Sequence, residues 1–380
     1  MKKTIAITSA LAAASSLATA EIKINEFLSF AGFVDASYSH TDSELSTSGA
    51  SSKDSENSFA IDQVEIDWMF NFGKVTAQVD LQYENGANGD DDATEVEQAF
   101  VNYDLGNGLV ITAGRYESVL GLEAKEPTGL YQYSTAYGDN NILPQYAQGV
   151  KLTKTVGDNV YSLSLQDESF EEDADRLGGD GDSSYAIEAG ASIALSDGLT
   201  WFIGGAHEDA DAGDSYVINT HLTYVADAWT YGAEVSYGDS ERGDSAFVSP
   251  ILDVLDGIAA FSGGTIGDDF SIDDADIEVL QLMIMANYAY SDCCSVTGRI
   301  SYINTEASGS DASATVTPLG VVNTGPFSGI ESEVLKYTLA HNYAVTDNLA
   351  VITEISYIDG EAEDFDTEAL VGAVEVLFTF

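Results

Sequence analysis

The sequence predicts an all-β fold, a transmembrane antiparallel β-barrel of about 16 strands with short turns at one end and long loops at the other. Residues 75–83, 229–237 and 349–357 alternate between apolar and polar side chains, which is typical of strands with one lipid-facing and one wet face. Such runs are separated alternately by short turns and by long polar loops. The chain ends on an apolar strand, residues 370–380, whose edge would be sticky unless it pairs with another strand.

The first 20 residues have the pattern of a secretory signal peptide. Lys2 and Lys3 form a charged start, residues 5–17 form an apolar stretch, and residues 18–20 (Ala-Thr-Ala) form a small-residue cleavage site. A membrane anchor is the alternative, but the apolar stretch is too short to cross a bilayer. We therefore expect export, with residues 21–380 forming one barrel domain.

Net charge excludes several kinds of partner. The chain has 64 Asp and Glu against 13 Lys and Arg, which gives a formal net charge of −51. A surface this acidic repels nucleic acid and anionic lipid. The hydrophobic content of 44% is nevertheless too high for a disordered acidic chain. Charge and apolar residues must therefore be segregated, and stretches 84–97 and 167–182 carry much of the acid.

The strands and their connections follow from the alternation and from turn residues. The expected strand cores are 27–40, 59–72, 74–84, 95–105, 109–116, 148–155, 160–166, 185–195, 199–207, 215–225, 228–237, 276–290, 294–303, 333–343, 349–357 and 368–380. Gly, Asn and Asp mark the tight turns, at 72–74, 106–108, 157–159, 196–198, 226–227, 291–292 and 346–348. The long loops are expected at 42–58, 85–94, 117–147, 167–184, 208–214, 238–275, 304–332 and 358–367. An even strand count places both chain ends on the short-turn, periplasmic side.

The polar faces of the strands are expected to line a wet interior. Acidic side chains are costly in a dry core but stable against water. The inward carboxylates predicted from strand parity are Glu65, Asp67, Asp80, Glu234 and Glu354. Aromatic residues gather at strand ends, as in the belts that mark membrane–water interfaces. A soluble β-sandwich is the alternative, but it leaves the terminal Phe380 and the signal peptide unexplained.

Little in the sequence points to catalysis or a cofactor. The four histidines have no metal-ligand spacing, and no Ser, His and Asp arrangement stands out, so we expect no enzyme and no cofactor. Asp90, Asp91 and Asp92 are expected to be solvated, with loosely bound Ca²⁺ at the acidic loops as the alternative. Cys293 and Cys294 are neighbours at a turn, where two free thiols are simpler than a strained vicinal disulfide.

Three segments resemble Gram-negative outer-membrane porins of the general diffusion type. Residues 30–38 (Phe-Ala-Gly-Phe-Val-Asp-Ala-Ser-Tyr) are similar to the first porin strand. Residues 113–115 (Ala-Gly-Arg), a long loop and residues 148–152 (Gln-Gly-Val-Lys-Leu) resemble a strand, the inward-folded third loop and the next strand. The alternation that ends on Phe378 and Phe380 is similar to the signal recognised by the outer-membrane assembly machinery.

The resemblance implies a water-filled barrel for passive diffusion of ions and small hydrophilic solutes. The protein would lie in the bacterial outer membrane among lipid and lipopolysaccharide, as a homotrimer. The apolar face of residues 186–195 suits either a protomer contact or lipid. The loop at 117–147 would fold into the barrel and narrow it, with acidic loop residues facing cations on the wall.

The constriction residues come partly from the resemblance and partly from parity. The resemblance assigns Glu123, Lys125 and Glu126 to the loop and Arg115 to the wall. Parity points three further cations inward, at Lys151, Arg299 and Lys336. Arg115 shares its face with the apolar Ala113, so it turns inward only through a bulge at Gly114 or at the strand end.

Inward carboxylates outnumber inward cations, so the sequence predicts a cation-preferring channel. Two other classes remain open. A substrate-specific channel for a sugar, phosphate or small acid would show saturable conductance. An outer-membrane enzyme or adhesin with a plugged barrel would show none.

Overall fold

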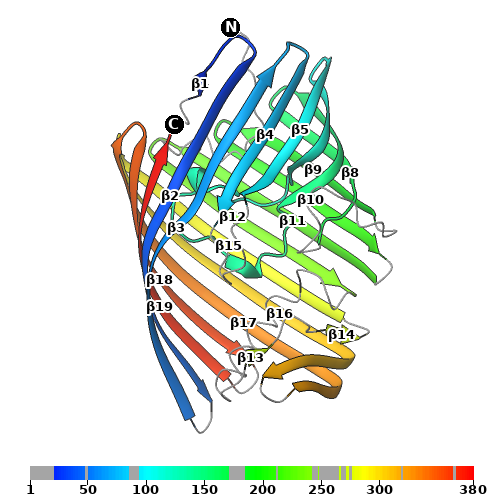
Figure 1. Cartoon of the computed structure of the whole chain (residues 1–380), viewed down its shortest axis with the longest axis vertical. Helices are drawn as coiled ribbons and strands as arrows, with labels where there is room; N and C mark the ends of the chain where they lie inside the picture. The colour runs from blue at the N-terminus through cyan, green and yellow to red at the C-terminus, as the bar shows by residue number, and fades with distance from the viewer. Residues whose placement is uncertain are drawn as a thin grey trace.

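Sixteen antiparallel strands form a ring that closes where the last strand pairs with the first long one (Figure 1). In this pairing Phe365 lies opposite Thr47 and Thr379 lies opposite Phe33. The backbone of Phe380 exchanges two further hydrogen bonds of 2.9 Å with Gly32. Each ring strand therefore has a neighbour on both sides, which removes the unpaired edge that an apolar terminal strand would otherwise expose.

The computed structural model describes residues 21–47, 50–84, 94–170, 185–210, 213–241, 247, 265–266, 271–273, 276–317, 320–362 and 365–380. The ring strands are β2 (Leu28–Thr47), β3 (Ala50–Asn71), β4 (Val75–Glu84), β5 (Thr94–Gly106), β6 (Leu109–Glu117), β7 (Tyr146–Val156), β8 (Asn159–Gln166), β9 (Tyr185–Ser196), β10 (Leu199–Ala210), β11 (Gly213–Ala226), β12 (Trp229–Ser240), β15 (Asp276–Ser291), β16 (Cys294–Thr317), β17 (Gly320–Thr346), β18 (Leu349–Ala362) and β19 (Phe365–Thr379). Three short strands add to the ring, namely β1 (Ile22–Lys23) on β2, and β13 (Thr265–Ile266) and β14 (Ser271–Asp273) on β16. Two 3-10 turns, η1 (Pro127–Gly129) and η2 (Gly138–Asn140), lie between β6 and β7. In these ranges no helix has the length and apolar character needed to span a bilayer.

The predicted barrel and its strand count are confirmed, but several predicted loops are wrong. The strands on either side of 42–58, 208–214, 304–332 and 358–367 continue through most of these segments. The largest correction is at 304–332, where β16 and β17 extend to Thr317 and Gly320 as one long hairpin. Outside the bilayer both faces of a strand are wet, so the alternation that reveals a membrane strand disappears there. The signal peptide at 1–20 and Asp90, Asp91 and Asp92 lie outside the described residues.

The two faces of the wall follow the predicted alternation. Outward apolar side chains such as Ile284, Leu339 and Ile355 are more than half exposed, as expected for a surface that faces lipid. Near the short turns, Trp229 stacks on Tyr288 with ring centroids 4.5 Å apart. This stacking is typical of an aromatic belt at a membrane–water interface.

Candidate functional site

The connection between β6 and β7, residues 118–145, lies inside the barrel and is called the inner loop below (Figure 1). Hydrogen bonds tie it to strands far from its own. The backbone N–H of Leu122 donates to Glu234 on β12 at 2.7 Å. Gln281 on β15 donates through Nε2 to the carbonyl oxygen of Asn140 at 2.6 Å. The inner loop therefore reaches across the lumen rather than lying over its mouth.

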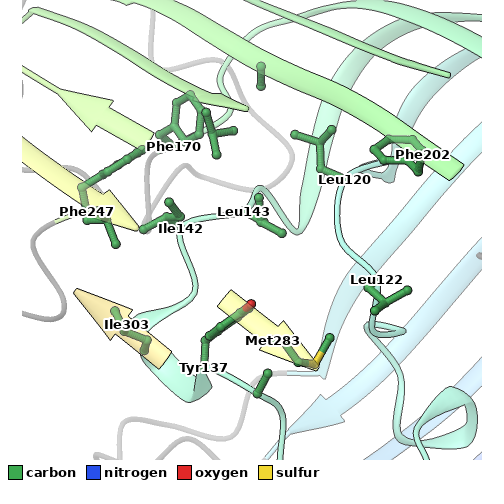
Figure 2. Packing of buried hydrophobic residues seen from close by; sticks show 14 of the residues in the cluster. Leu120, Leu122, Tyr137, Ile142, Leu143, Phe170, Phe202, Phe247, Met283 and Ile303 are labelled. Carbon is green, nitrogen blue, oxygen red and sulfur yellow. The ribbon is translucent and has the colours of Figure 1, made fainter. Parts of the chain in front are cut away.

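An apolar cluster holds the inner loop against one half of the wall (Figure 2). The loop contributes Leu120, Leu122, Tyr131, Ala136, Tyr137, Ile142 and Leu143, and the wall contributes inward residues of β10, β11, β15 and β16, among them Phe202, Val217, Ile277, Val279, Met283, Met285 and Ile303. Burying one such side chain stabilises the fold by about 1.5–3 kcal/mol. This half of the lumen is therefore packed like the core of a soluble protein.

The sequence contains an indication that this half of the lumen is packed, although the alternation of inward and outward residues does not reveal it. Residues 279–285 are apolar at almost every position, not at alternate ones. A continuous apolar run is typical of a strand buried on both faces. In the structure Val279, Met283 and Met285 are buried against the inner loop, while Ile284 faces outward.

Arg299 on β16 is the main polar anchor of the inner loop. Its side chain is fully buried, and Nη1 lies 2.6 Å from Oε1 of Glu123. The same guanidinium donates to the carbonyl oxygens of Ser134 at 2.7 Å and Thr135 at 2.9 Å. The structure thus brings together two of the residues predicted for the constriction, and their charges compensate each other.

Lys336 and Glu354 bind the same turn of the inner loop. The Lys336 ammonium donates to Oγ of Ser134 at 2.8 Å and to the carbonyl oxygen of Thr135 at 3.0 Å. The backbone N–H of Ser134 donates to Glu354 at 3.0 Å. Glu354, like Glu234, therefore points inward as predicted from parity. Both carboxylates accept hydrogen bonds from the backbone of the inner loop, which they hold in place.

The other predicted cations are also engaged in local contacts. Lys125 donates to two carbonyl oxygens of the inner loop, those of Leu120 and Pro144, and burial lowers its pKa. Lys151 donates to the carbonyl oxygen of Glu117 at 2.9 Å and lies 4.2 Å above the Tyr116 ring. These ammonium groups stabilise the loop and its base.

Arg115 lines the lumen cavity and follows Gly114, a glycine with a positive φ. The φ of Gly114 is +127°, and a Cβ there would meet the carbonyl oxygen of Ala99. Only glycine adopts such a backbone easily, although the pairing of β6 with β5 and β7 continues through this position without a register shift. The Nε of Arg115 donates to the carbonyl oxygen of Glu97 at 2.9 Å, and the guanidinium lies 5.5 Å from the Tyr146 ring.

Carboxylates gather on strands of the wall that contribute no residue to the apolar cluster. This acidic wall consists of Asp35, Asp62, Glu65, Asp67, Asp80, Glu97 and Glu375, on strands β2 to β5 and β19. Parity predicted Glu65, Asp67 and Asp80 of this set. Glu126 of the inner loop joins it, because a carboxylate oxygen of Glu126 lies within 4.8 Å of ligand atoms on Glu65 and Glu97.

Two of the missed carboxylates occupy β-bulges. Asp35 pairs with Gln63 and the next residue pairs with Ile61, so Asp62 is an extra residue in β3. Glu97 is likewise extra in β5, because its neighbours at 96 and 98 pair with consecutive residues of β4. A bulge re-aims a side chain against the parity of its strand. Asp35 and Glu375 are on regular inward positions, and parity alone could have found them.

The predicted assembly residues close the ring. The Phe380 ring lies 6.2 Å from Phe30 and 5.9 Å from Phe378. Phe378 is 43% exposed on the outer face. At the turn between β15 and β16, Cys293 and Cys294 are free thiols with their sulfur atoms 3.3 Å apart.

The protonation of Glu126 allows a test of the contact between the inner loop and the acidic wall. Its carboxylate accepts hydrogen bonds from Gln63 at 3.0 Å and Tyr146 at 2.9 Å. Burial, followed by repulsion from Glu97, raises the pKa of Glu126 well above its ordinary value. The folded protein therefore retains a proton that the unfolded chain releases. This contribution to stability is complete below the ordinary pKa and is lost as the pH rises through the raised one.

We expect the midpoint of thermal unfolding in detergent to fall as pH rises from about 5 to about 8, and the Glu126→Gln variant to show a shallower fall. Circular dichroism at several pH values measures both slopes. Asp347→Asn, at an exposed turn, is the matched control and should keep the wild-type slope. Equal slopes for Glu126→Gln and wild type would contradict the assignment.

Comparisons with known proteins agree with this architecture. Residues 28–380 match the family described as "Putative beta-barrel porin-2, OmpL-like". The outer membrane channel DcaP of Acinetobacter baumannii is similar at a TM-score of 0.60 and 11% identity, over 93% of this chain and 97% of that one. A loop L8 deletion mutant of OmpT, an outer membrane protein of Vibrio cholerae, is similar at a TM-score of 0.58 and 12% identity, over 93% of this chain and 99% of that one. An anion-selective porin from Comamonas acidovorans is similar at a TM-score of 0.55 and 12% identity, over 93% of this chain and 99% of that one.

A search of curated proteins found no match. At these identities the structural neighbours show a shared fold, whereas the family match spans nearly the whole chain. Together with the closed ring and its lipid-facing surface, the match places the protein in the bacterial outer membrane. The chain belongs to the β-barrel porin-2, OmpL-like family.

Proposed function

We propose that this protein is a passive diffusion channel, not an enzyme, and that its passage prefers cations. The passage runs between the inner loop and the acidic wall, where a cavity of about 640 Å³ is lined by Gln63, Gln82, Glu97, Arg115 and Glu126 among others. Polar side chains on this side offer a hydrated path, and the inner loop sets the size limit for solutes.

The observation that carries the proposal is the unequal use of the two kinds of charge. Arg299, Lys336, Lys125 and Lys151 donate to carbonyl oxygens of the inner loop or its base. The seven carboxylates of the acidic wall outnumber the single guanidinium of Arg115 on the cavity lining. A low-dielectric wall focuses such charge onto the water path and raises the local cation concentration.

The fold itself does not determine the sign of selectivity. One structural neighbour is described as an anion-selective porin, and it shares 12% identity with this chain. Selectivity must therefore come from the residues that line each passage. In this chain acidic residues outnumber basic ones among the charged residues that line the cavity.

Reversal potential across a planar bilayer under a KCl gradient tests the proposal. We expect cation preference in the wild type and a smaller one in the Glu97→Gln, Asp167→Asn double variant, which changes two carboxylates that line the cavity. One charge about 10 Å from a permeating ion in water contributes about 0.4 kcal/mol, so the loss of two should lower the permeability ratio by roughly fourfold or more. Asp347→Asn is the control outside the passage and should leave the ratio unchanged. Anion preference in the wild type would refute the proposal.

The same recordings separate the other functional classes. Conductance that follows bulk salt supports a general channel. Saturation and block by a sugar, phosphate or small acid would instead indicate a substrate-specific one, and absence of conductance would indicate a plugged barrel with an enzymatic or adhesive role.

We also propose a homotrimer surrounded by outer-membrane lipid and lipopolysaccharide and inserted by the outer-membrane assembly machinery. Support for the trimer comes from a neighbour described as the trimer form of OmpT, at a TM-score of 0.55 and 11% identity. Conductance steps in groups of three, together with chemical cross-linking, would check this assembly.

A further inference from the structure

Three carboxylates of the acidic wall converge on one point between β3 and β4. Oxygen atoms of Glu65, Asp67 and Asp80 all lie within 4.8 Å of one another. Asp80 is fully buried, and its Oδ2 accepts hydrogen bonds of 2.9 Å from Gln78 and Gln98. Its Oδ1 is buried and has no hydrogen-bond partner. A buried carboxylate oxygen without a donor is costly, so this oxygen calls for a ligand.

No cation of the described chain neutralises this group. None of the three carboxylates has a lysine or arginine nitrogen within 4.0 Å in the part of the chain that the structure describes. Glu65 accepts a hydrogen bond of 3.2 Å from the neutral amide of Gln63. Like charges at this spacing do not all remain ionised unless a proton or a cation is shared among them.

The spacing fits a hard divalent cation. Ca²⁺ binds six to eight oxygen atoms at about 2.3–2.6 Å, so oxygens on opposite sides of one ion are roughly 4.6–5.2 Å apart. Carboxylates and side-chain carbonyls are its usual ligands. Mg²⁺ needs shorter distances and stricter octahedral geometry, which makes it the poorer fit to a group supplied by flexible side chains.

We propose that Glu65, Asp67 and Asp80 bind a Ca²⁺ ion. A second group at the same spacing, Glu65 with Glu97 and Glu126, shares one carboxylate with the first. Through it the ion site extends from β3 and β4 to β5 and to the inner loop. Bound Ca²⁺ then fixes Glu65, the carboxylate that the site shares with Glu126 of the inner loop.

Titration of the detergent-purified, EDTA-treated protein with CaCl₂ tests the site by calorimetry. We expect saturable binding in the wild type and at least about tenfold weaker binding in Asp80→Asn, which keeps the shape but removes one ligand charge. CaCl₂ should raise the unfolding midpoint of the wild type. In EDTA, Asp80→Asn should unfold at or above the wild-type midpoint because repulsion is relieved, whereas a purely structural role would lower it.

The exposed group Asp239, Asp276 and Glu278 supplies the control, since it has the same number of carboxylates at the same spacing. Glu278→Gln should bind CaCl₂ as the wild type does. Asp67→Asn provides a second variant in case Asp80→Asn does not fold. Absence of saturable binding in the wild type, or loss of binding in Glu278→Gln but not in the wall variants, would overturn the proposal. The result does not depend on ion selectivity, because no current is measured.

Discussion

Replacing Arg299 with alanine is expected to free the inner loop, to destabilise the barrel by about 3–5 kcal/mol and to raise single-channel conductance. The guanidinium joins Glu123 to two loop carbonyls, and its side chain has no exposure to water. Without it, the Glu123 carboxylate loses its charged partner although it stays mostly buried, 11% exposed. An uncompensated charge of this kind is what makes removal of one member of a buried pair so costly. Planar-bilayer recording and thermal unfolding in detergent measure the two effects.

Two matched variants separate this anchor from a general effect of losing a cation. Adding Glu123→Gln to Arg299→Ala removes the stranded charge and should recover part of the lost stability, which a double-mutant cycle measures. Lys53→Ala breaks an ion pair of the same 2.6 Å length, with Glu44, on an exposed hairpin. No measurable change is expected there, because water already screens both groups. A conductance in Arg299→Ala equal to that of the wild type would show that the apolar cluster alone holds the loop.

Deleting Phe380 is expected to remove most of the protein from the outer membrane. The deletion breaks two backbone hydrogen bonds to Gly32, worth about 1 kcal/mol each, and removes the ring that lies against Phe30. It also removes the terminal aromatic residue that resembles the assembly signal. Heat-modifiable mobility of the outer-membrane fraction measures the loss.

Refolding of the purified chain into detergent distinguishes the two roles of Phe380. If the deleted chain still closes in vitro, the loss in cells comes from recognition by the assembly machinery. Phe72→Ala is the control, since Phe72 is an aromatic at a short turn, 60% exposed and stacked on Phe27 at 5.5 Å, without a part in ring closure. Normal levels of the Phe380 deletion would contradict both roles.

The alternation of side chains along the strands and the residues of the turns were sufficient to predict the barrel. Every strand that crosses a membrane must pair its backbone on both sides and place apolar side chains toward lipid. The same rule fails outside the bilayer, where β16 and β17 continue as a hairpin through a segment predicted to be a loop. Parity also fails at bulges. Asp62 and Glu97 face the lumen because each is an extra residue in its strand. A single inserted residue leaves no periodic pattern in the sequence, so such a bulge is not predicted.

The inner loop shows a different limit of sequence reasoning. Parity puts Arg299 and Lys336 on the inner face, where the structure has them, but it does not say what they bind. Their partners include the backbone carbonyls of Ser134 and Thr135, and backbone carbonyls are groups that every residue possesses and no sequence pattern marks. By donating to these carbonyl oxygens, the cations on the wall hold the inner loop in place. Charge counting over the lumen therefore misjudges how many cations a permeating ion meets.

The separation along the chain between the inner loop and its supports has a consequence for the order of assembly. Ser134 and Glu354 are 220 residues apart, and Glu354 belongs to the next-to-last strand of the ring. Contacts of such high sequence separation form late, because the intervening chain must first be organised. The inner loop therefore reaches its final position late, after nearly all the hairpins around it have formed.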